Sequence, residues 1–125
     1  MSRVVVCRWE NLELIKVTEM VSRKIVSANS QVVSQLYLKR GTHIPSCVSE
    51  SDRSIYVLQG VLRMRVDNEE ILVGEGEIIQ ISAQLTRQAE ALDDTFAIEF
   101  SSTGSTTPRA VHREQLLTHL SALSA

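Results

Sequence analysis

A short stretch in the middle of the chain gathers side chains that could do chemistry. His43, Cys47 and Ser49 are separated by even numbers of residues, so on a regular strand they point to the same side. Cys47 would be a nucleophile or a redox group if neighbouring positive charge favoured its thiolate, and His43 is placed to act as its base. A buried cysteine is more often a small apolar side chain, so both interpretations stay open.

The rest of the chain must form the elements that position this stretch, and it is rich in short β-branched segments. Many of them alternate with period two, as in residues 61–66, where apolar and basic residues take turns. Turn-forming pairs such as Arg40-Gly41 and Gln59-Gly60 separate the segments. Short strands without intervening helices predict an all-β sandwich or barrel. The predicted strands are Val4–Val6, Leu12–Val17, Lys24–Ser27, Val32–Leu38, Ile55–Leu58, Leu62–Val66, Glu70–Val73, Ile78–Ile81 and Phe96–Phe100.

The end of the chain changes character. A polar linker rich in serine, threonine and glycine leads to Thr107-Pro108, a helix N-cap followed by proline at the first helical position. The apolar residues of 109–123 then fall on one helical face. We therefore expect a β-barrel domain over 1–102, and a polar linker with an amphipathic α-helix over 103–125. This helix would pack on its own barrel or against a second subunit.

Length and composition set further limits. The chain has 125 residues, which fits one domain. Its formal net charge of −2 argues against a nucleic-acid partner, because such proteins need a basic surface. No apolar run is long enough for a membrane span or a signal peptide, and Cys7 and Cys47 form no disulfide framework. The sequence therefore predicts a cytoplasmic protein with reduced thiols and no membrane partner.

The spacing of residues 41–60 resembles the first motif of the cupin family. That motif is a glycine, five residues, His-x-His, three or four residues, Glu, six residues and a glycine. Gly41 and Gly60 stand at its two ends, while Cys47, Ser49 and Arg53 occupy the His, His and Glu positions. The resemblance implies a cupin double-stranded β-helix, which is an all-β jelly-roll barrel, and a homodimer.

A second segment resembles the second cupin motif, although more loosely. Gly76 opens that motif, an apolar strand follows, and Arg87 occupies the position of its histidine. The two motifs occur in order and at the right separation. Together the resemblance covers roughly residues 30–100 of the chain.

The resemblance also shows where the chain departs from the family. The family's four usual metal ligands fall at Cys47, Ser49, Arg53 and Arg87, so none is histidine or glutamate. A divalent metal needs several donors with lone pairs, whereas arginine supplies none and adds positive charge. We therefore expect no metal and no other cofactor. A residual site made of His43 and Cys47 would have too few protein ligands.

In cupins these positions face the interior of the barrel, so two arginines there suggest a pocket for a carboxylate or another small organic anion. The alternative is that Arg53 and Arg87 are paired within the protein, since a buried unpaired charge is costly. Their internal partners would be Glu50, Asp52, Glu90 or Glu99. The ligand-binding residues predicted on the first hypothesis are Arg53, Arg87, Cys47, Ser49, His43, Gln35 and Tyr37.

Three functions follow from these residues. The first is a metal-free cupin that binds a small organic anion, a carboxylate or a sugar acid, since the segment is similar to small sugar-binding or uronate-processing cupins. The second is a metal-independent isomerase, epimerase or lyase, for which His43, Cys47 and Tyr37 are the candidate acids and bases. The third is a regulatory or partner-binding protein that keeps only the scaffold. The sequence leaves open whether the protein is an enzyme.

Overall fold

The computed structural model of the protein describes residues 4–102. Within this part the chain is almost entirely β-structure, preceded by one short 3-10 helix. The elements are η1 (Trp9–Asn11), β1 (Ile15–Lys16), β2 (Val21–Ser27), β3 (Gln31–Leu38), β4 (His43–Val48), β5 (Arg53–Gln59), β6 (Val61–Val66), β7 (Glu69–Gly74), β8 (Ile78–Ile81), β9 (Thr86–Ala91) and β10 (Thr95–Ser102).

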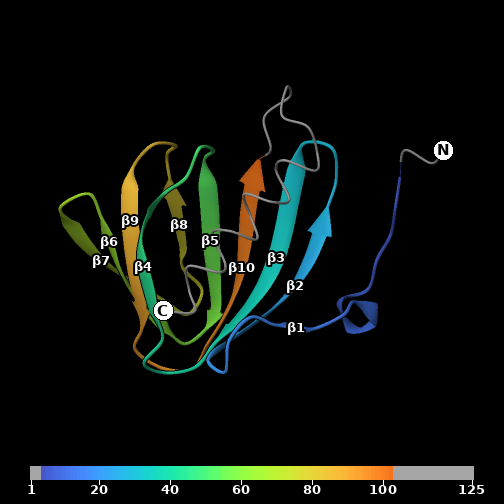
Figure 1. The fold of residues 1–125 in the computed structure, drawn as a ribbon, viewed down its shortest axis with the longest axis horizontal. Coiled ribbons are helices and arrows are strands. Elements are labelled where there is room, and N and C mark those ends of the chain that lie inside the picture. The colour runs from blue at the N-terminus through green and yellow to red at the C-terminus, as the bar shows by residue number, and fades with distance from the viewer. Residues whose placement is uncertain (1–3, 103–125) are drawn as a thin grey trace.

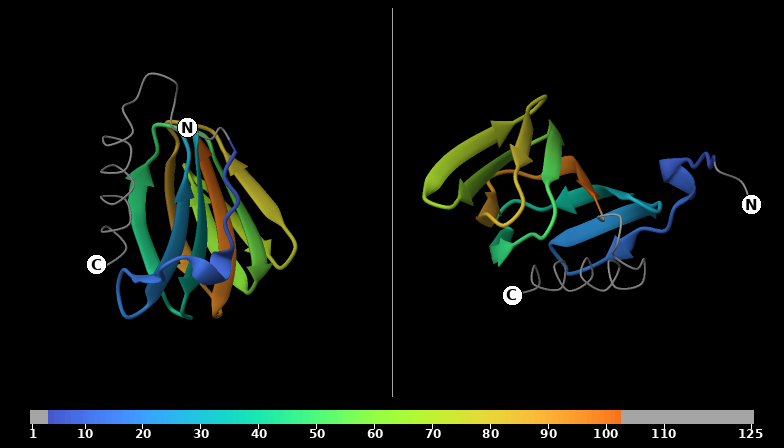
Figure 2. Two further views of the ribbon diagram at one scale, coloured as in Figure 1. Left: turned by 90° about the vertical axis from the view of Figure 1, so that its right-hand side faces the viewer. Right: turned by 90° about the horizontal axis from the view of Figure 1, so that it is seen from above.

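The strands form two antiparallel sheets that pack face to face (Figures 1 and 2). One sheet has six strands in the order β1-β2-β3-β10-β5-β8, and the other has four in the order β4-β9-β6-β7. Strands distant in sequence thus become neighbours, as β10 does between β3 and β5. This topology brings β4, β5, β9 and β10, which carry the candidate site residues, around one interior.

The core lies between the sheets and follows from the period-two alternation of the strands. On β3, Val32, Leu36 and Leu38 are buried, and on β6 Leu62 and Met64 are buried. Because successive side chains point to opposite faces, each strand gives one row to the core and one row to the outside. The alternation seen in the sequence therefore fixes which side chains can reach the interior.

Most of the predicted strands are confirmed, and β8 has the predicted bounds Ile78–Ile81. The strand predicted at Val4–Val6 is wrong, because these residues do not form a strand, and they are 75%, 78% and 90% exposed. Of the strand predicted at Leu12–Val17 only Ile15–Lys16 forms. The predicted strands did not include β4 and β9. The histidine, proline, arginine and glutamine residues of these two strands interrupt the alternation of apolar and polar residues by which the other strands were predicted.

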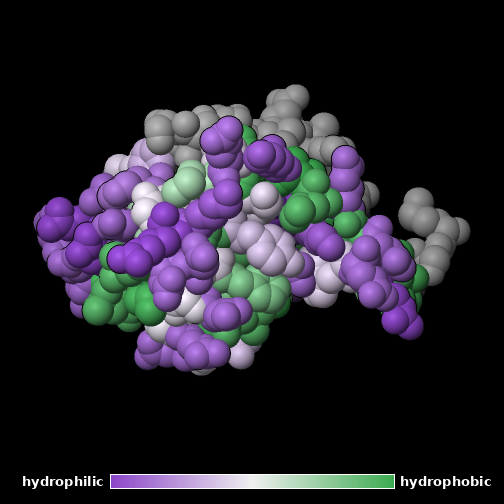
Figure 3. Space-filling view, turned by 90° about the horizontal axis from the view of Figure 1, so that it is seen from below, coloured by the Kyte–Doolittle hydropathy of each residue, from purple (hydrophilic) through white to green (hydrophobic). Residues whose placement is uncertain are grey.

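The predicted amphipathic helix over 109–123 lies outside the described residues, as does most of the predicted linker. Among residues 4–102, no helix combines the length and the apolar character that a membrane crossing requires. Seen from below, hydrophilic side chains gather at the end of the molecule where β6 and β7 lie, and separate apolar patches interrupt the remaining surface (Figure 3).

The turn between β5 and β6 depends on the absence of a side chain at Gly60. Its φ is +97°, and a Cβ built there would lie 2.5 Å from the carbonyl oxygen of Asp94 and from Oγ1 of Thr95. Gly76 has a similar φ of +82°, but a Cβ there would meet nothing within 4 Å. The two glycines therefore share the backbone conformation that disfavours side chains and differ in the space around it.

Gly60→Ala should destabilise the protein considerably more than Gly76→Ala. Both alanines carry the strain of the left-handed conformation, about 1–2 kcal/mol, and only Gly60→Ala adds a steric clash, about 1–3 kcal/mol by analogy with overpacking. Urea denaturation of the two variants beside the parent measures the difference in the free energy of unfolding. Equal losses would show that the approach of Asp94 and Thr95 does not constrain the turn.

Candidate functional site

An ion-pair cluster between the two sheets occupies the centre of the candidate site. Nη1 of Arg53 lies 3.1 Å from Oε1 of Glu99, and Nη2 of Arg87 lies 3.4 Å from Oε2 of the same carboxylate. Arg53 begins β5, Arg87 is on β9 and Glu99 is on β10, so the cluster links both sheets. The three residues are 8%, 5% and 5% exposed. Of the two hypotheses for the arginines, the internal ion pair is confirmed, with Glu99 as the shared partner.

The two remaining ligand positions of the family lie beside this cluster. Oγ of Ser49 accepts a hydrogen bond of 2.7 Å from Nε of Arg53 and donates one of 2.8 Å to the carbonyl oxygen of Ser51. Cys47 stands directly opposite Arg87 in the pairing of β4 with β9. The four positions identified by motif spacing therefore converge at one place in the fold, as the resemblance predicted.

The residues at this place do not fit a divalent metal. Two of the four family positions are guanidinium groups, which have no lone pair to donate and bring positive charge. Within residues 4–102, no group of three or more histidine, cysteine, aspartate or glutamate side chains is arranged to hold a metal ion. Glu99, the one carboxylate placed between the arginines, is already bonded to both.

A small cavity adjoins the cluster on the inside of the barrel. Its volume is about 30 Å³, which is room for about two water molecules, each needing ~10–15 Å³ by this measure. Arg87, Glu99 and Gln88 supply its polar lining, and the rest is mostly apolar. The apolar lining residues are Leu36, Leu38, Ile44, Ile55, Leu62, Met64, Ala89 and Ala97. A sugar acid is too large for this space.

His43 does not lie where the strand alternation predicted it. Residues Pro45 and Ser46 of β4 stand opposite the single residue Gln88 of β9, because Ile44 pairs with Ala89 and Cys47 with Arg87. Such a β-bulge inserts one residue and reverses the alternation beyond it. Ile44 and Cys47 therefore share the inward side, and the side chain of His43 points outward, 70% exposed, with Nε2 at 3.7 Å from Oε2 of Glu90.

Gln35 and Tyr37 also lie outside the barrel, on the outer face of the six-stranded sheet. On β3 the inward positions are Val32, Ser34, Leu36 and Leu38, which leaves the odd-numbered positions to face outward. Oη of Tyr37 donates a hydrogen bond of 3.1 Å to Oε1 of Gln35, and the Tyr37 ring stacks on Phe96 with centroids 4.8 Å apart. Neither side chain can orient a ligand between Arg53 and Arg87.

The catalytic candidates consequently do not form one site. His43 lies on the outer face of the four-stranded sheet, Tyr37 on the outer face of the six-stranded sheet, and Cys47 on the inward side of β4. A general acid and base must both reach the same substrate. The arrangement of described residues gives the isomerase, epimerase or lyase hypothesis no geometric support.

One buried charged residue was missed by the sequence analysis. Arg23 is 1% exposed and lies between the inward-facing Val21 and Ile25 of β2. Its place in the alternation of that strand is the signal that would have found it. With Arg53 and Arg87 it makes three buried arginines in the described part of the chain.

Two packed antiparallel sheets, in which strands distant in sequence are neighbours, are typical of a jelly-roll β-barrel. Neither protein-family models nor curated protein sequences match the chain. Solved structures do match. KdgF from Halomonas sp. shares 22% identity over 74% of this chain and 87% of its own, with a TM-score of 0.70. An RmlC-like cupin from Shewanella frigidimarina shares 13% identity over 80% of this chain and 91% of its own, with a TM-score of 0.73.

Oxalate decarboxylase from Bacillus subtilis, a protein described with Mn(II) centres, is similar over 86% of this chain and 35% of its own length, with 14% identity and a TM-score of 0.67. These similarities show that the chain has the cupin fold. The resemblance derived from the spacing of its glycines and ligand positions is thereby confirmed for the fold.

Glu99→Gln should strongly destabilise the protein, because it removes the negative charge that both buried guanidinium groups contact. The expected loss in the free energy of unfolding is about 3–5 kcal/mol, the usual cost of removing one partner from a buried pair. Glu90→Gln is the matched control on the outer face, where loss of a surface pair costs at most about 1 kcal/mol. Urea denaturation of both variants measures the difference.

A triple variant, Arg53→Met with Arg87→Met and Glu99→Leu, completes this test. Replacing all three charges by apolar groups removes the need for pairing, so the triple variant should be more stable than Glu99→Gln alone. Equal stability of Glu99→Gln and Glu90→Gln would show that Glu99 does not neutralise the arginines.

Proposed function

We propose that this protein is a metal-free cupin that binds a small organic anion in the cavity beside Arg87 and Glu99. The single observation that carries the proposal is the charge of the cluster, in which two buried guanidinium groups share one carboxylate. The cluster stands where cupins of the metal-binding type hold their cation. An anion, and not a cation, is the ligand that such a site attracts.

Arg87 is the guanidinium group best placed to contact the anion. Both of its hydrogen bonds to Glu99 are 3.4 Å long, at the weak end of hydrogen-bond geometry. Arg53, by contrast, is held at 3.1 Å by Glu99 and at 2.7 Å by Ser49. Arg87 also lines the cavity, while Arg53 does not. A ligand carboxylate could therefore engage Arg87 while Arg53 keeps Glu99 in place.

The size and lining of the cavity favour a short carboxylate. About 30 Å³ excludes a sugar ring, so the ligand must be among the smallest carboxylates, formate or acetate. A largely apolar wall with a few polar groups is the usual make-up of a small-molecule site. By its name oxalate decarboxylase, which shares this fold, also acts on a short carboxylate.

The protein as purified should bind acetate or formate without a stoichiometric metal. At one hundred times its Kd the anion should raise the free energy of unfolding by about 2.7 kcal/mol, measured by urea denaturation with chloride as the control salt. Arg87→Lys should lose most of this gain, because a lysine cannot form the paired hydrogen bonds of a guanidinium group. Arg40→Lys, an exposed arginine, is the matched control and should keep it.

Two results would contradict this proposal. One is a transition metal that remains at one per chain after dialysis, measured by elemental analysis. The other is stabilisation by acetate that is the same in Arg87→Lys as in the parent.

We also propose that the protein is a homodimer that buries the outer face of its six-stranded sheet. Val26, Val33 and Phe100 lie side by side on that face, and Ile98, Tyr56 and Ile78 lie side by side in the next row. Phe100 is 45% exposed and Ile78 is 62% exposed. A contiguous apolar face of this kind marks an interaction surface, and a twofold axis through it would place like rows against each other.

Phe100→Lys should convert the dimer to a monomer, because it places a charge in the centre of the buried face. Leu72→Lys is the control, since Leu72 is 61% exposed on the other sheet. Light scattering coupled to size-exclusion chromatography measures the mass of each variant. A parent protein that is monomeric at all accessible concentrations would overturn the dimer proposal.

A further inference from the structure

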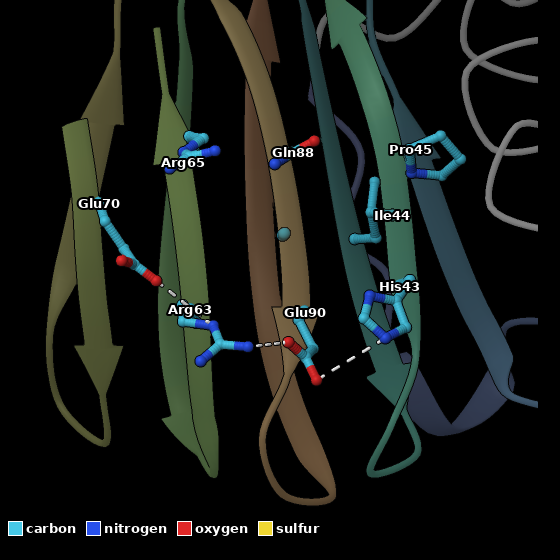
Figure 4. A pocket seen from close by; sticks show the side chains of 9 residues that line it. His43, Ile44, Pro45, Arg63, Arg65, Glu70, Gln88 and Glu90 are labelled. Carbon is cyan, nitrogen blue, oxygen red and sulfur yellow. Dashed lines mark hydrogen bonds and ion pairs between the residues drawn. The ribbon is translucent and has the colours of Figure 1, made fainter. Parts of the chain in front are cut away.

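A cleft of about 380 Å³ lies against the four-stranded sheet, on the side facing away from the core (Figure 4). It opens on the opposite side of the sheet from the interior cavity beside Arg87, with which it shares the lining residues Ile44, Gln88 and Ala89. It is large enough for a metabolite, since ligand sites usually measure about 300–1,000 Å³. Three neighbouring strands, β4, β9 and β6, supply most of its lining, and β7 supplies Glu70. The lining residues are His43, Ile44, Pro45, Arg63, Arg65, Glu70, Gln88, Ala89 and Glu90.

One end of the cleft is fixed by a chain of ion pairs. Glu90 contacts His43 through one oxygen, at 3.7 Å, and Arg63 through the other. Nε of Arg63 in turn lies 3.5 Å from Oε1 of Glu70. Both carboxylates of the cleft are thus engaged by Arg63, and Figure 4 shows the three side chains pointing toward one another along the sheet.

At the other end of the cleft lies the guanidinium group of Arg65, which takes no part in these ion pairs. Arg65 stands directly opposite Gln88 in the pairing of β6 with β9, and in Figure 4 these two side chains lie away from the Glu90–His43 pair. Among the described residues Arg65 has no acidic group within ion-pairing distance, although Glu70 is its register partner on β7. The side-chain amide of Gln88 can add one hydrogen bond to the same ligand group.

We propose that this cleft binds a small hydroxylated monocarboxylate, with its carboxylate on Arg65 and Gln88. A guanidinium group holds a planar carboxylate through paired hydrogen bonds. Residues i and i+2 of a strand are about 7 Å apart. Hydroxyl groups at that distance from the ligand's carboxylate therefore reach Glu90, whose carboxylate can accept hydrogen bonds from them. The ligand therefore extends along β9 from residue 88 to residue 90.

The charges of the cleft favour a monoanion over a dianion. The positive charges of Arg63 and Arg65 equal in number the negative charges of Glu70 and Glu90. Both carboxylates form ion pairs with Arg63, so a ligand with one negative charge can pair with Arg65. A phosphate monoester, with a charge of about −1.5 to −2 at neutral pH, would be repelled by the two carboxylates. This site differs from the one proposed inside the barrel in its guanidinium group, which is Arg65 here and Arg87 there, and its ligand is larger than acetate.

The proposal is tested by isothermal titration of the full-length protein with gluconate, glucose and glucose 6-phosphate. Gluconate is expected to bind, and neutral glucose and the doubly charged phosphate ester to bind at least tenfold more weakly. Arg65→Gln should weaken gluconate binding at least tenfold while the variant stays folded, because Arg65 is exposed. Glu90→Gln should weaken it by a smaller factor, and Arg40→Gln should leave it unchanged.

Failure of this site is distinguishable from failure of the inner one. Acetate stabilisation, which depends on Arg87, should be the same in Arg65→Gln as in the parent. Gluconate binding that survives Arg65→Gln unchanged would overturn the proposal, as would glucose or glucose 6-phosphate binding as tightly as gluconate. No detectable gluconate binding to the parent would overturn it as well, whatever the result with acetate.

Discussion

The carboxylate of Glu99, shared between the guanidinium groups of Arg53 and Arg87, is the interaction on which the interior of this protein depends. It joins β5 and β10 of one sheet to β9 of the other. All three side chains are nearly inaccessible to water, so each charge needs an oppositely charged or hydrogen-bonding partner other than bulk water. One carboxylate contacts two guanidinium groups here, and this arrangement is the basis of the anion site that we propose.

The same positions cannot serve a cation. A metal site at this place requires imidazole and carboxylate donors with free lone pairs, whereas Arg53 and Arg87 direct N–H groups toward their partner. Oxalate decarboxylase, which has a similar fold, is described with Mn(II) centres. The cupin scaffold therefore fixes where the interior residues meet and leaves open what they bind. In this chain guanidinium groups replace imidazole and carboxylate at these positions, and a guanidinium group pairs with anions and donates no lone pair to a cation.

Much of the fold follows from the sequence, because apolar residues recur with period two and glycines stand at the required separations. Gly60 is an example, since the turn it forms tolerates no side chain. Motif spacing also placed Cys47, Ser49, Arg53 and Arg87 together, and Glu99 was among the internal partners expected for the arginines. Strand alternation misplaced His43, because two residues, Pro45 and Ser46, stand opposite one across a β-bulge. A single inserted residue reverses every side chain beyond it, and local sequence does not reveal such an insertion.

That bulge also places the side chains of His43 and Cys47 on opposite faces of the four-stranded sheet. Without it, His43 and Cys47 would share one side of β4 and the interior would hold a potential base beside a thiol. With it, Cys47 lies by Arg87 on the inward side, and His43 lies beside Glu90 on the outward side. The interior keeps a cavity of about 30 Å³, while the outer face of the same strands forms a cleft of about 380 Å³. Both spaces are lined by residues of β4 and β9, and the packing of the core limits the inner one to the smallest molecules, so only the outer one has the volume for a ligand larger than acetate.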